Sequence, residues 1–562
     1  MSGDVRSFQA LLWGAVSVLN VSGGTTDPGF LYRQNEAALR GGVHFVEAGG
    51  DSERVRPTVS ITSPTAGQRW SNAVFVLKGT AKDNVRVDEV RYKLNGEDWE
   101  EASTTNRWTN WTATVRLLPG TNLVRVYAKD TSGNRSLTNV RAFAYVLNIP
   151  FGLTINGGGT VTPLTPGQPL ELGKRYTIKA TPRLGNLFSN WVGSVTSTNR
   201  TLSFFWASNF NLTANFVTNP FIALRGTYTG LHQLPDEPVW DSSGLFKLML
   251  GPAGTYSGRL YLAGASYSFS GAFDQSLESQ KRVLRPGTNE LIVSLQLLEG
   301  SDQVTGSVSN ASFFTQLVGY RSGFSTANPA TNLAGKYTAV LSGGGDPVTS
   351  PFGQGFATFT VAHSGSVVMK GKLADGTAVA QSTPLAGDGE VVCHATLYSR
   401  RGSIFGWLSF TNAPDTVLIT GPLLWTKTPT TSGNFYRGGF ANTVNTLGSR
   451  YTATNKPVLN FRNAVVRLEG GNLSAPLTND VVLSPLNKVT VAPTNVHRLT
   501  LTLSAAAGTF SGTFHNPATG KTSSIKGALL QKQNVGSGFF LGTNQSGRVY
   551  FGPPEGYPMP LP

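Results

Sequence analysis

Residues 111–134 are WTATVRLLPGTNLVRVYAKDTSGN, and apolar side chains recur there at every second position in two separate runs. One run begins at Trp111 and the other passes through Val124, and both alternate in the way of β-strands that bury one face. Gly120 lies in the turn between the runs, and Gly133 lies in the turn that follows the second. The stretch predicts neighbouring strands of an antiparallel sheet.

The same alternation extends upstream to Pro57, through the runs PTVSITSP, VFVLKGTAKDN and VDEVRYKLNG. Gly, Pro, Asn and Asp separate these runs at about ten-residue spacing, which is typical of a β-sandwich. We therefore predict a sandwich domain over residues 57–147.

The turn and strand residues of this domain resemble those of the bacterial immunoglobulin-like domain. The matching residues are Pro57, Ser63, Pro64, Asp83, Asn84, Tyr92, Asn95, Gly96, Pro119, Gly120, Thr121, Asn122, Val124, Val126, Ala128, Asp130, Gly133 and Asn134. The resemblance implies a spacer or adhesive domain outside the cell, with no chemistry of its own.

Residues 151–217 are similar to the divergent internalin B-repeat module. The matching segments are Gly159 to Pro163, Tyr176 to Pro182, Phe188, Trp191 to Gly193, and Leu212 to Val217. A sheet of about 70 residues needs large side chains to fill its core, so we expect Phe188 and Trp191 to be buried.

The rest of the chain contains an internal repeat. The pattern Leu224-x-Gly226-x-Tyr228 returns at Leu333-x-Gly335-x-Tyr337, and again in altered form at Leu447-Gly448-x-x-Tyr451. A second marker, Tyr320 to Phe324, returns as Tyr436 to Phe440. The repeats are about 110 residues long, and we place them at residues 221–330, 331–445 and 446–553, with a Pro-rich tail at 554–562.

The first repeat contains roughly eight strand-like runs joined mostly by short turns, which suit either an up-and-down barrel or a sandwich. The region also resembles the β-rich C-terminal segments of predicted bacterial surface proteins of unknown function. That resemblance implies a cellular setting and no mechanism. The predicted fold class is all-β and multidomain: an Ig-like β-sandwich, a small β-repeat module, and three related antiparallel β-barrel or sandwich units.

Composition narrows the classes of partner. The net charge is +15, but Lys and Arg are spread along the chain without a basic stripe, so we predict no nucleic-acid partner. Cys393 is the only cysteine, which excludes an intrachain disulfide and a cysteine-based zinc site. No run of 18 apolar residues occurs, so we predict no membrane-spanning helix.

Residues 1–56 form a separate N-terminal segment. Ala10 to Val21 have the length of a signal-peptide core, but Asp4 offsets Arg6 and the cleavage pattern is poor. We expect a truncated or mispredicted start, with a degenerate signal or a buried element of a further domain as alternatives.

The sequence offers no catalytic constellation. Glu290 and Glu390 are the least implausible carboxylate pair for glycoside hydrolysis, since most other acids of the C-terminal region fall in turns. Cys393 and His394 are neighbours on a predicted strand and point to opposite faces, so they do not form a dyad, and we expect Cys393 in the core. We predict no catalytic residue and no cofactor.

Metal ligands are equally sparse. The six histidines lack the close spacing of transition-metal sites. The turns at Asp83-Asn84 and Asp130 to Asn134 offer oxygen ligands for calcium, but Asp and Asn favour turns for backbone reasons alone. We therefore predict no metal site and leave calcium open.

Aromatic residues give the best candidates for recognition. Trp99, Trp108 and Trp111 are close together in the Ig-like stretch, and surface tryptophans can stack on sugars or anchor protein partners. Trp111 begins a strand and is expected in the core, whereas Trp108 lies in a loop and is expected to be exposed. Trp108 and Trp99 are the predicted contacts for a carbohydrate or another partner.

These observations predict a non-catalytic, exported, modular surface or matrix protein with a spacer or adhesion role, located outside the cell or at its surface. A carbohydrate-binding protein that uses exposed aromatic residues is the first alternative. A glycan-active hydrolase or lyase is the second. The expected partner is a glycan or another surface macromolecule, and the sequence specifies neither the ligand nor the oligomeric state.

Overall fold

The structure is a computed structural model that describes residues 53–234, 239–343, 346–413, 416–453 and 457–556. Within these ranges the chain is nearly all strand, and its helical elements are the four-residue α1 (Phe221–Leu224) and the 3-10 turn η1 (Pro554–Gly556). The all-β prediction is confirmed. No helix in the described ranges has the length and apolar character needed to cross a membrane. The predictions for residues 1–52 lie outside the described residues.

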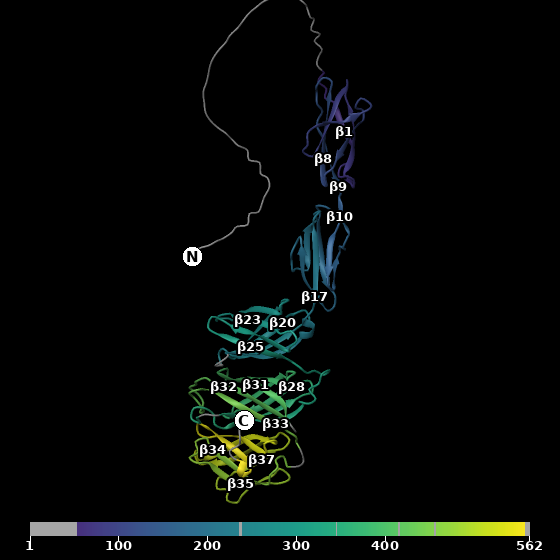
Figure 1. The fold of residues 1–562 in the computed structure, drawn as a ribbon. Helices are drawn as coiled ribbons and strands as arrows, with labels where there is room; N and C mark the ends of the chain where they lie inside the picture. Colours follow the sequence, from purple (N-terminus) through teal and green to yellow (C-terminus); the bar gives the residue numbers. More distant parts are fainter. Residues whose placement is uncertain (1–52, 235–238, 344–345, 414–415, 454–456, 557–562) are drawn as a thin grey trace, which may run out of the picture. The chain divides into compact units, whose positions relative to one another are not determined.

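The chain divides into two compact units, Met1–Tyr145 and Val146–Pro562. The described part of the first unit is a sandwich of two sheets, which is drawn in purple and blue in Figure 1. One sheet has the order β1 (Thr58–Ser63), β3 (Val74–Lys82), β7 (Trp111–Arg116), β6 (Ser103–Thr104). The other has the order β2 (Arg69–Trp70), β9 (Asn139–Tyr145), β8 (Gly120–Asp130), β4 (Val87–Leu94), β5 (Glu100–Glu101).

The inward residues of these strands form one core, as the period-two pattern predicts. Trp111 is 1% exposed and belongs to this core, which confirms the expectation for this residue. The indole lies against Gly79, where a Cβ atom would come within 2.2 Å of the ring. Glycine at this position therefore makes room for the largest side chain of the core.

The second unit begins with a small module built from three short sheets. Their orders are β10 (Asn148–Pro150), β13 (Pro169–Glu171); β11 (Gly152–Asn156), β17 (Asn211–Thr218), β15 (Asn186–Gly193); and β12 (Gly159–Thr162), β14 (Arg175–Pro182), β16 (Thr201–Phe205). Phe188 and Trp191 are both buried in its core, as expected. The indole nitrogen of Trp191 donates to the carbonyl oxygen of Asn199 at 2.9 Å, so the buried polar atom is satisfied.

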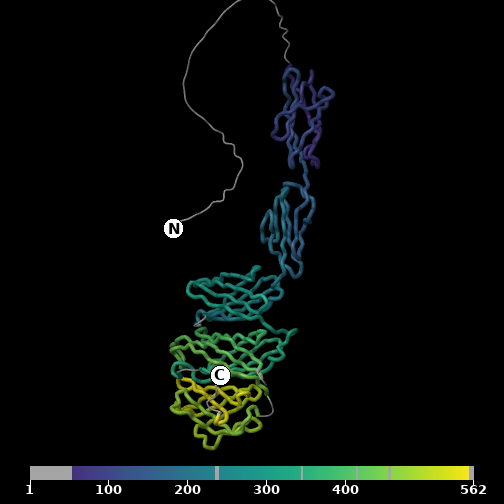
Figure 2. The backbone as a smooth tube through the Cα atoms, viewed as in Figure 1, coloured from purple at the N-terminus to yellow at the C-terminus, as the bar shows by residue number. Residues whose placement is uncertain are grey.

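Three eight-stranded antiparallel sheets follow in the described residues, and we call them the first, second and third barrel. The backbone of each sheet curls round in Figure 2, and each sheet pairs its first strand in sequence with its last. The first barrel has the order β21 (Ala265–Ala272), β20 (Thr255–Leu262), β19 (Gly244–Leu250), β18 (Gly226–Gln233), β25 (Phe314–Arg321), β24 (Gln303–Ser309), β23 (Leu291–Leu297), β22 (Glu278–Val283).

The second barrel has the order β29 (Ala378–Pro384), β28 (Ser366–Lys372), β27 (Gln354–Val361), β26 (Gly335–Gly343), β33 (Phe440–Arg450), β32 (Thr416–Lys427), β31 (Gly402–Ala413), β30 (Glu390–Leu397). The third has the order β36 (Val489–Val491), β35 (Leu477–Leu483), β34 (Asn463–Gly470), β41 (Ser546–Gly552), β40 (Val535–Leu541), β39 (Lys521–Leu530), β38 (Thr509–Asn516), β37 (Thr500–Ser504). Pairing of the first strand with the last makes these sheets barrel-like, so the barrel alternative holds.

The repeat motif has the same place in the first two barrels. Gly226 and Gly335 each begin the first strand with φ of +151°, a backbone angle that favours glycine. The third copy is placed differently, because Leu447 lies in β33, the last strand of the second barrel. The sequence border at residues 445 and 446 thus falls inside a strand, and the third barrel begins its first strand at Asn463.

Neighbouring barrels of this unit share buried contacts. Leu231 of the first barrel packs with Val392 and Phe405 of the second. The second and third barrels share a larger apolar cluster, which contains Val340, Leu447, Val465, Ala528, Leu530, Val535 and Tyr550. Consecutive barrels are therefore joined by packing as well as by the chain.

Candidate functional site

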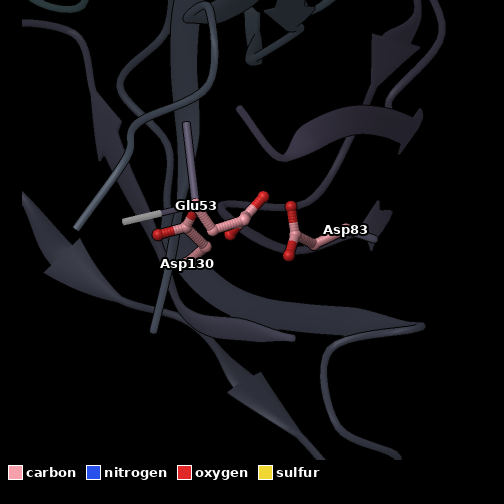
Figure 3. Close-up of side chains that lie close together, drawn as sticks. All are labelled: Glu53, Asp83 and Asp130. Carbon is pink, nitrogen blue, oxygen red and sulfur yellow. The ribbon is translucent and has the colours of Figure 1, made fainter. Parts of the chain in front are cut away.

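Three carboxylates gather at one place in the sandwich of the first unit. Glu53 precedes β1, Asp83 follows β3 and Asp130 ends β8, and one oxygen atom from each lies within 4.8 Å of the others. Figure 3 shows the three side chains drawn together. Carboxylate oxygens at this spacing can serve as ligands for a cation.

Backbone amides hold Asp83 by one oxygen. Oδ2 of Asp83 accepts hydrogen bonds of 2.9 Å from the backbone N–H groups of Val85 and Arg86, the usual capping of a turn by aspartate. Oδ1 is buried and has no hydrogen-bond partner among the described residues. The turn therefore fixes the carboxylate and leaves one buried oxygen without a donor.

Asp130 is held more completely. Its Oδ1 accepts from the backbone N–H groups of Ser132 and Asn134, and its Oδ2 accepts from the Asn134 side-chain amide at 2.9 Å. Burial alone would raise the pKa of Asp130, but these hydrogen bonds outweigh it and hold the pKa below its ordinary value. Asp130 is thus a buried carboxylate in its charged form at neutral pH.

Asn134 also connects Asp130 to the segment that enters the sandwich. Its side-chain amide donates to the backbone carbonyl oxygen of Glu53 at 2.7 Å. Both carboxylate oxygens of Glu53 are buried and lack a hydrogen-bond partner within the described ranges. The sequence had indicated the turns of Asp83 and Asp130, but Glu53 lies in the N-terminal segment, where no pattern marked it.

Trp108, one of the two predicted contact residues, is held by the sandwich. Its indole nitrogen donates to the carbonyl oxygen of Asp88 at 2.8 Å, and its ring packs against the core. Its backbone N–H donates to Oγ1 of Thr104 at 3.0 Å. We expected an exposed ring, but the loop folds back and leaves Trp108 half-buried.

Trp99, the other predicted contact residue, is also half-buried. Its ring meets Tyr127 edge to face at a centroid distance of 4.6 Å, and the Lys93 ammonium lies 5.2 Å from the ring centroid. Asp88 and Lys93 are five residues apart on β4, which is roughly 16 Å along a strand. The two tryptophans therefore contact different parts of β4 and do not form one continuous platform.

Two stretches of the chain match known domain families. Residues 57–138 match the bacterial Ig domain. Residues 151–220 match the divergent InlB B-repeat domain, in the order that the sequence predicted. Domains of these two kinds are typical of modular bacterial surface proteins and are typically non-catalytic. The chain is therefore similar, over these residues, to parts of surface proteins.

A search of curated proteins finds no match. Among solved structures, the chain is similar to the fibronectin(III)-like modules of Clostridium thermocellum CbhA, with 15% identity over 38% of this chain and 91% of the other and a TM-score of 0.15. An I-band fragment of titin matches at 12% identity, over 51% and 93%, with a TM-score of 0.15. Bacteroides ovatus SGBP-B in complex with a mixed-linkage heptasaccharide matches at 10% identity, over 78% and 92%, with a TM-score of 0.14. TM-scores this low carry no weight for fold or function.

The two carboxylates considered for glycoside hydrolysis, Glu290 and Glu390, lie in the barrels and each accepts hydrogen bonds from another side chain. Glu290 of the first barrel accepts from the Arg282 guanidinium, with Nε at 3.0 Å from each carboxylate oxygen. Glu390 begins β30 of the second barrel and accepts from the Ser409 hydroxyl. The two acids belong to different barrels, and each already has a partner.

Cys393 and His394 lie on opposite faces of β30, as expected. Cys393 is 1% exposed in the core of the second barrel, and burial raises the pKa of its thiol to about 12. The His394 ring instead contacts Tyr261 of the first barrel at 6.2 Å between centroids. A protonated, buried thiol is not a nucleophile at neutral pH.

Proposed function

We propose that this chain is a non-catalytic, exported, modular bacterial surface or matrix protein with a spacer or adhesion role. The Ig domain followed by the B-repeat supports this setting, because both kinds of domain are typical of surface proteins. The proposed function requires that the protein is exported and is located at the cell surface or in the medium.

The shared core between the second and third barrels is the observation that carries the spacer role. Val340 and Leu447 of one barrel are buried with Leu530 of the other, and the Thr338 hydroxyl donates to the Leu529 carbonyl oxygen at 2.6 Å across the same boundary. A spacer must hold its modules in fixed relation, and buried apolar contacts between modules favour that more than a flexible linker does.

Cell fractionation with the native full-length protein tests the location. We expect the protein in the medium or at the surface, where external protease removes it from intact cells. A cytoplasmic marker enzyme in the same cells must resist the protease. Recovery of the native protein solely from the cytoplasm would contradict the proposal.

The alternative function is glycan binding through Trp99 and Trp108. It is motivated by Trp99, which is only half-buried. Pulldown on insoluble polysaccharides discriminates it, with Trp70→Ala as the matched control for loss of a partly exposed indole. A pure spacer role, without adhesion to a glycan, expects no retention of the parent protein. Retention that disappears in Trp99→Ala or Trp108→Ala, but not in the control, would favour the glycan role.

The hydrolase or lyase alternative is tested with a panel of chromogenic glycosides and polysaccharides. The parent protein is expected to give no turnover above buffer. Turnover that Glu290→Gln or Glu390→Gln abolishes would overturn the non-catalytic assignment.

A further inference from the structure

We propose that Glu53, Asp83 and Asp130 bind one calcium ion in the Ig domain. Three carboxylates meet within 4.8 Å, and within the described ranges no Lys, Arg or His forms an ion pair with any of them. Like charges at this distance repel one another strongly where water is excluded. A cation bound among the three side chains labelled in Figure 3 would remove that repulsion.

The unpartnered oxygens point independently to a ligand. Both carboxylate oxygens of Glu53 and Oδ1 of Asp83 are shut off from solvent and accept no hydrogen bond from any described residue. Buried carboxylate oxygens almost always have a donor or a metal, because leaving them bare costs the full desolvation of a charge. A cation among the three side chains satisfies all of these atoms together.

The donor set favours calcium over other ions. All three side chains offer oxygen, which suits the hard cations Ca²⁺ and Mg²⁺, whereas zinc and copper sites generally use His or Cys. Ca²⁺ accepts several carboxylates in flexible geometry at 2.3–2.6 Å. Mg²⁺ requires near-ideal octahedral geometry and keeps several waters, so a site of three converging carboxylates suits it less well.

The location of the site gives the ion a structural role. Glu53 belongs to the segment that enters the sandwich, and Asp83 and Asp130 lie where β3 and β8 end. The ion would join these three parts of the chain, with Asn134 orienting both Glu53 and Asp130 through its amide. Calcium would therefore hold the segment that contains Glu53 against the Ig domain. This role does not depend on whether the chain acts as a spacer.

Equilibrium dialysis of the full chain with ⁴⁵Ca²⁺ tests binding directly. Glu53→Gln and Asp83→Asn should each bind one ion fewer than the parent, or bind that ion at least tenfold more weakly. Asp98→Asn is the matched control, because it removes one exposed charge from the same domain. Equal binding by the parent and both site variants, or no binding by the parent at 10 mM Ca²⁺, would overturn the proposal.

Thermal unfolding with and without calcium separates loss of ion binding from a general effect of the substitution on folding. Glu53 makes no side-chain hydrogen bond within the described ranges, so Glu53→Gln should still fold. In EDTA the variant should be at least as stable as the parent, because one repelling charge is gone. In 10 mM Ca²⁺ the order should reverse. Calcium should raise the melting temperature of the parent by roughly 5 °C or more above its value in EDTA.

Hydrogen exchange of the full chain locates the effect. Calcium should slow exchange in peptides that contain the turns after Asp83 and Asp130 in the parent, and not in Glu53→Gln. Mg²⁺, and NaCl at matched ionic strength, are the comparison ions. An equal response to either of them, or a response that persists in Glu53→Gln, would contradict a calcium site at these residues.

Discussion

The hydroxyl of Tyr337 donates a 2.6 Å hydrogen bond to the carbonyl oxygen of Leu333, four residues earlier in the chain. The first barrel repeats this bond from Tyr228 to Leu224 at the same distance. In the second barrel, the Arg450 guanidinium on the last strand donates to the Tyr337 hydroxyl at 3.2 Å and to the Ala334 carbonyl oxygen at 3.0 Å. In the second barrel, these hydrogen bonds therefore join the segment before the first strand, β26, to the end of the last strand, β33.

Tyr337→Phe should lower the free energy of unfolding of the second barrel by about 1–2 kcal/mol, because it removes a buried hydroxyl and leaves the Leu333 carbonyl unpaired. Urea denaturation followed by tryptophan fluorescence measures the change. Tyr267→Phe, on a half-buried residue of β21, is the control. A loss no greater than in that control would show that the bond contributes nothing.

This motif shows how far spacing along a sequence can predict structure. The period of the repeat identified the first two barrels, in which Tyr228 and Tyr337 have the same role. Tyr451 ends the altered copy of the motif, and its hydroxyl donates to the Ala505 carbonyl oxygen, far along the chain. The partner of a hydroxyl depends on tertiary packing, which a short motif does not encode. For the same reason, strand count alone left barrel and sandwich open, since pairing of β18 with β25 joins distant segments.

Acid should destabilise the first barrel through His232. This side chain is fully buried, its Nε2 lies 3.2 Å from the Tyr261 carbonyl oxygen, and burial lowers its pKa from 6.5 to about 4. Between these two values the unfolded chain binds the proton and the folded chain does not. The free energy of unfolding should therefore fall as the pH drops from about 6.5 to about 4, by on the order of 3 kcal/mol.

The slope of stability against pH is the quantity to measure, since His232→Gln also alters packing. The slope between pH 6.5 and 4 should be shallower in His232→Gln than in the parent. His363→Gln, on an exposed histidine, should leave it unchanged. Burial lowers the pKa of His394 to about 4 as well, so His394 should contribute to the same fall in stability. Equal slopes in all three proteins would contradict the role of His232.

Gln381 closes the seam of the second barrel, where no strand ladder joins β29 to β30 within the described ranges. Its side-chain amide donates to the Val392 carbonyl oxygen and accepts from the His394 backbone N–H at 2.6 Å. The side chain thus supplies both bonds that a neighbouring strand would make. Gln381→Ala should cost about 1–3 kcal/mol, because it leaves two backbone groups unpaired.

Hydrogen exchange at the His394 amide should also become faster in Gln381→Ala, because its acceptor is lost. Ser382→Ala, at an exposed position of the same strand, is the control. Unchanged exchange at His394 would mean that the seam is closed by other contacts.

In the sandwich, too, residues in local turns could be found from the sequence, whereas residues placed by distant contacts could not. Asp83 and Asp130 could be singled out from the sequence, because each begins a recognisable turn. Glu53 could not, since its position depends on a contact between its backbone and Asn134, which lies far along the chain. Trp108 was expected to be exposed because it lies in a polar loop, and only the bond to the Asp88 carbonyl oxygen reveals that the loop folds back.

Leu530→Ala should weaken the second and third barrels together. Leu530 has no exposed surface and packs with Val340 and Leu447 across the boundary between the barrels. Truncation leaves a cavity shared by both, and Leu→Ala changes in cores cost about 2–5 kcal/mol. Hydrogen exchange should accelerate in strands of both barrels, whereas Leu486→Ala, at an exposed position, should change neither. Acceleration confined to the third barrel would show that the two barrels unfold independently, which would contradict a spacer whose modules are held in fixed relation.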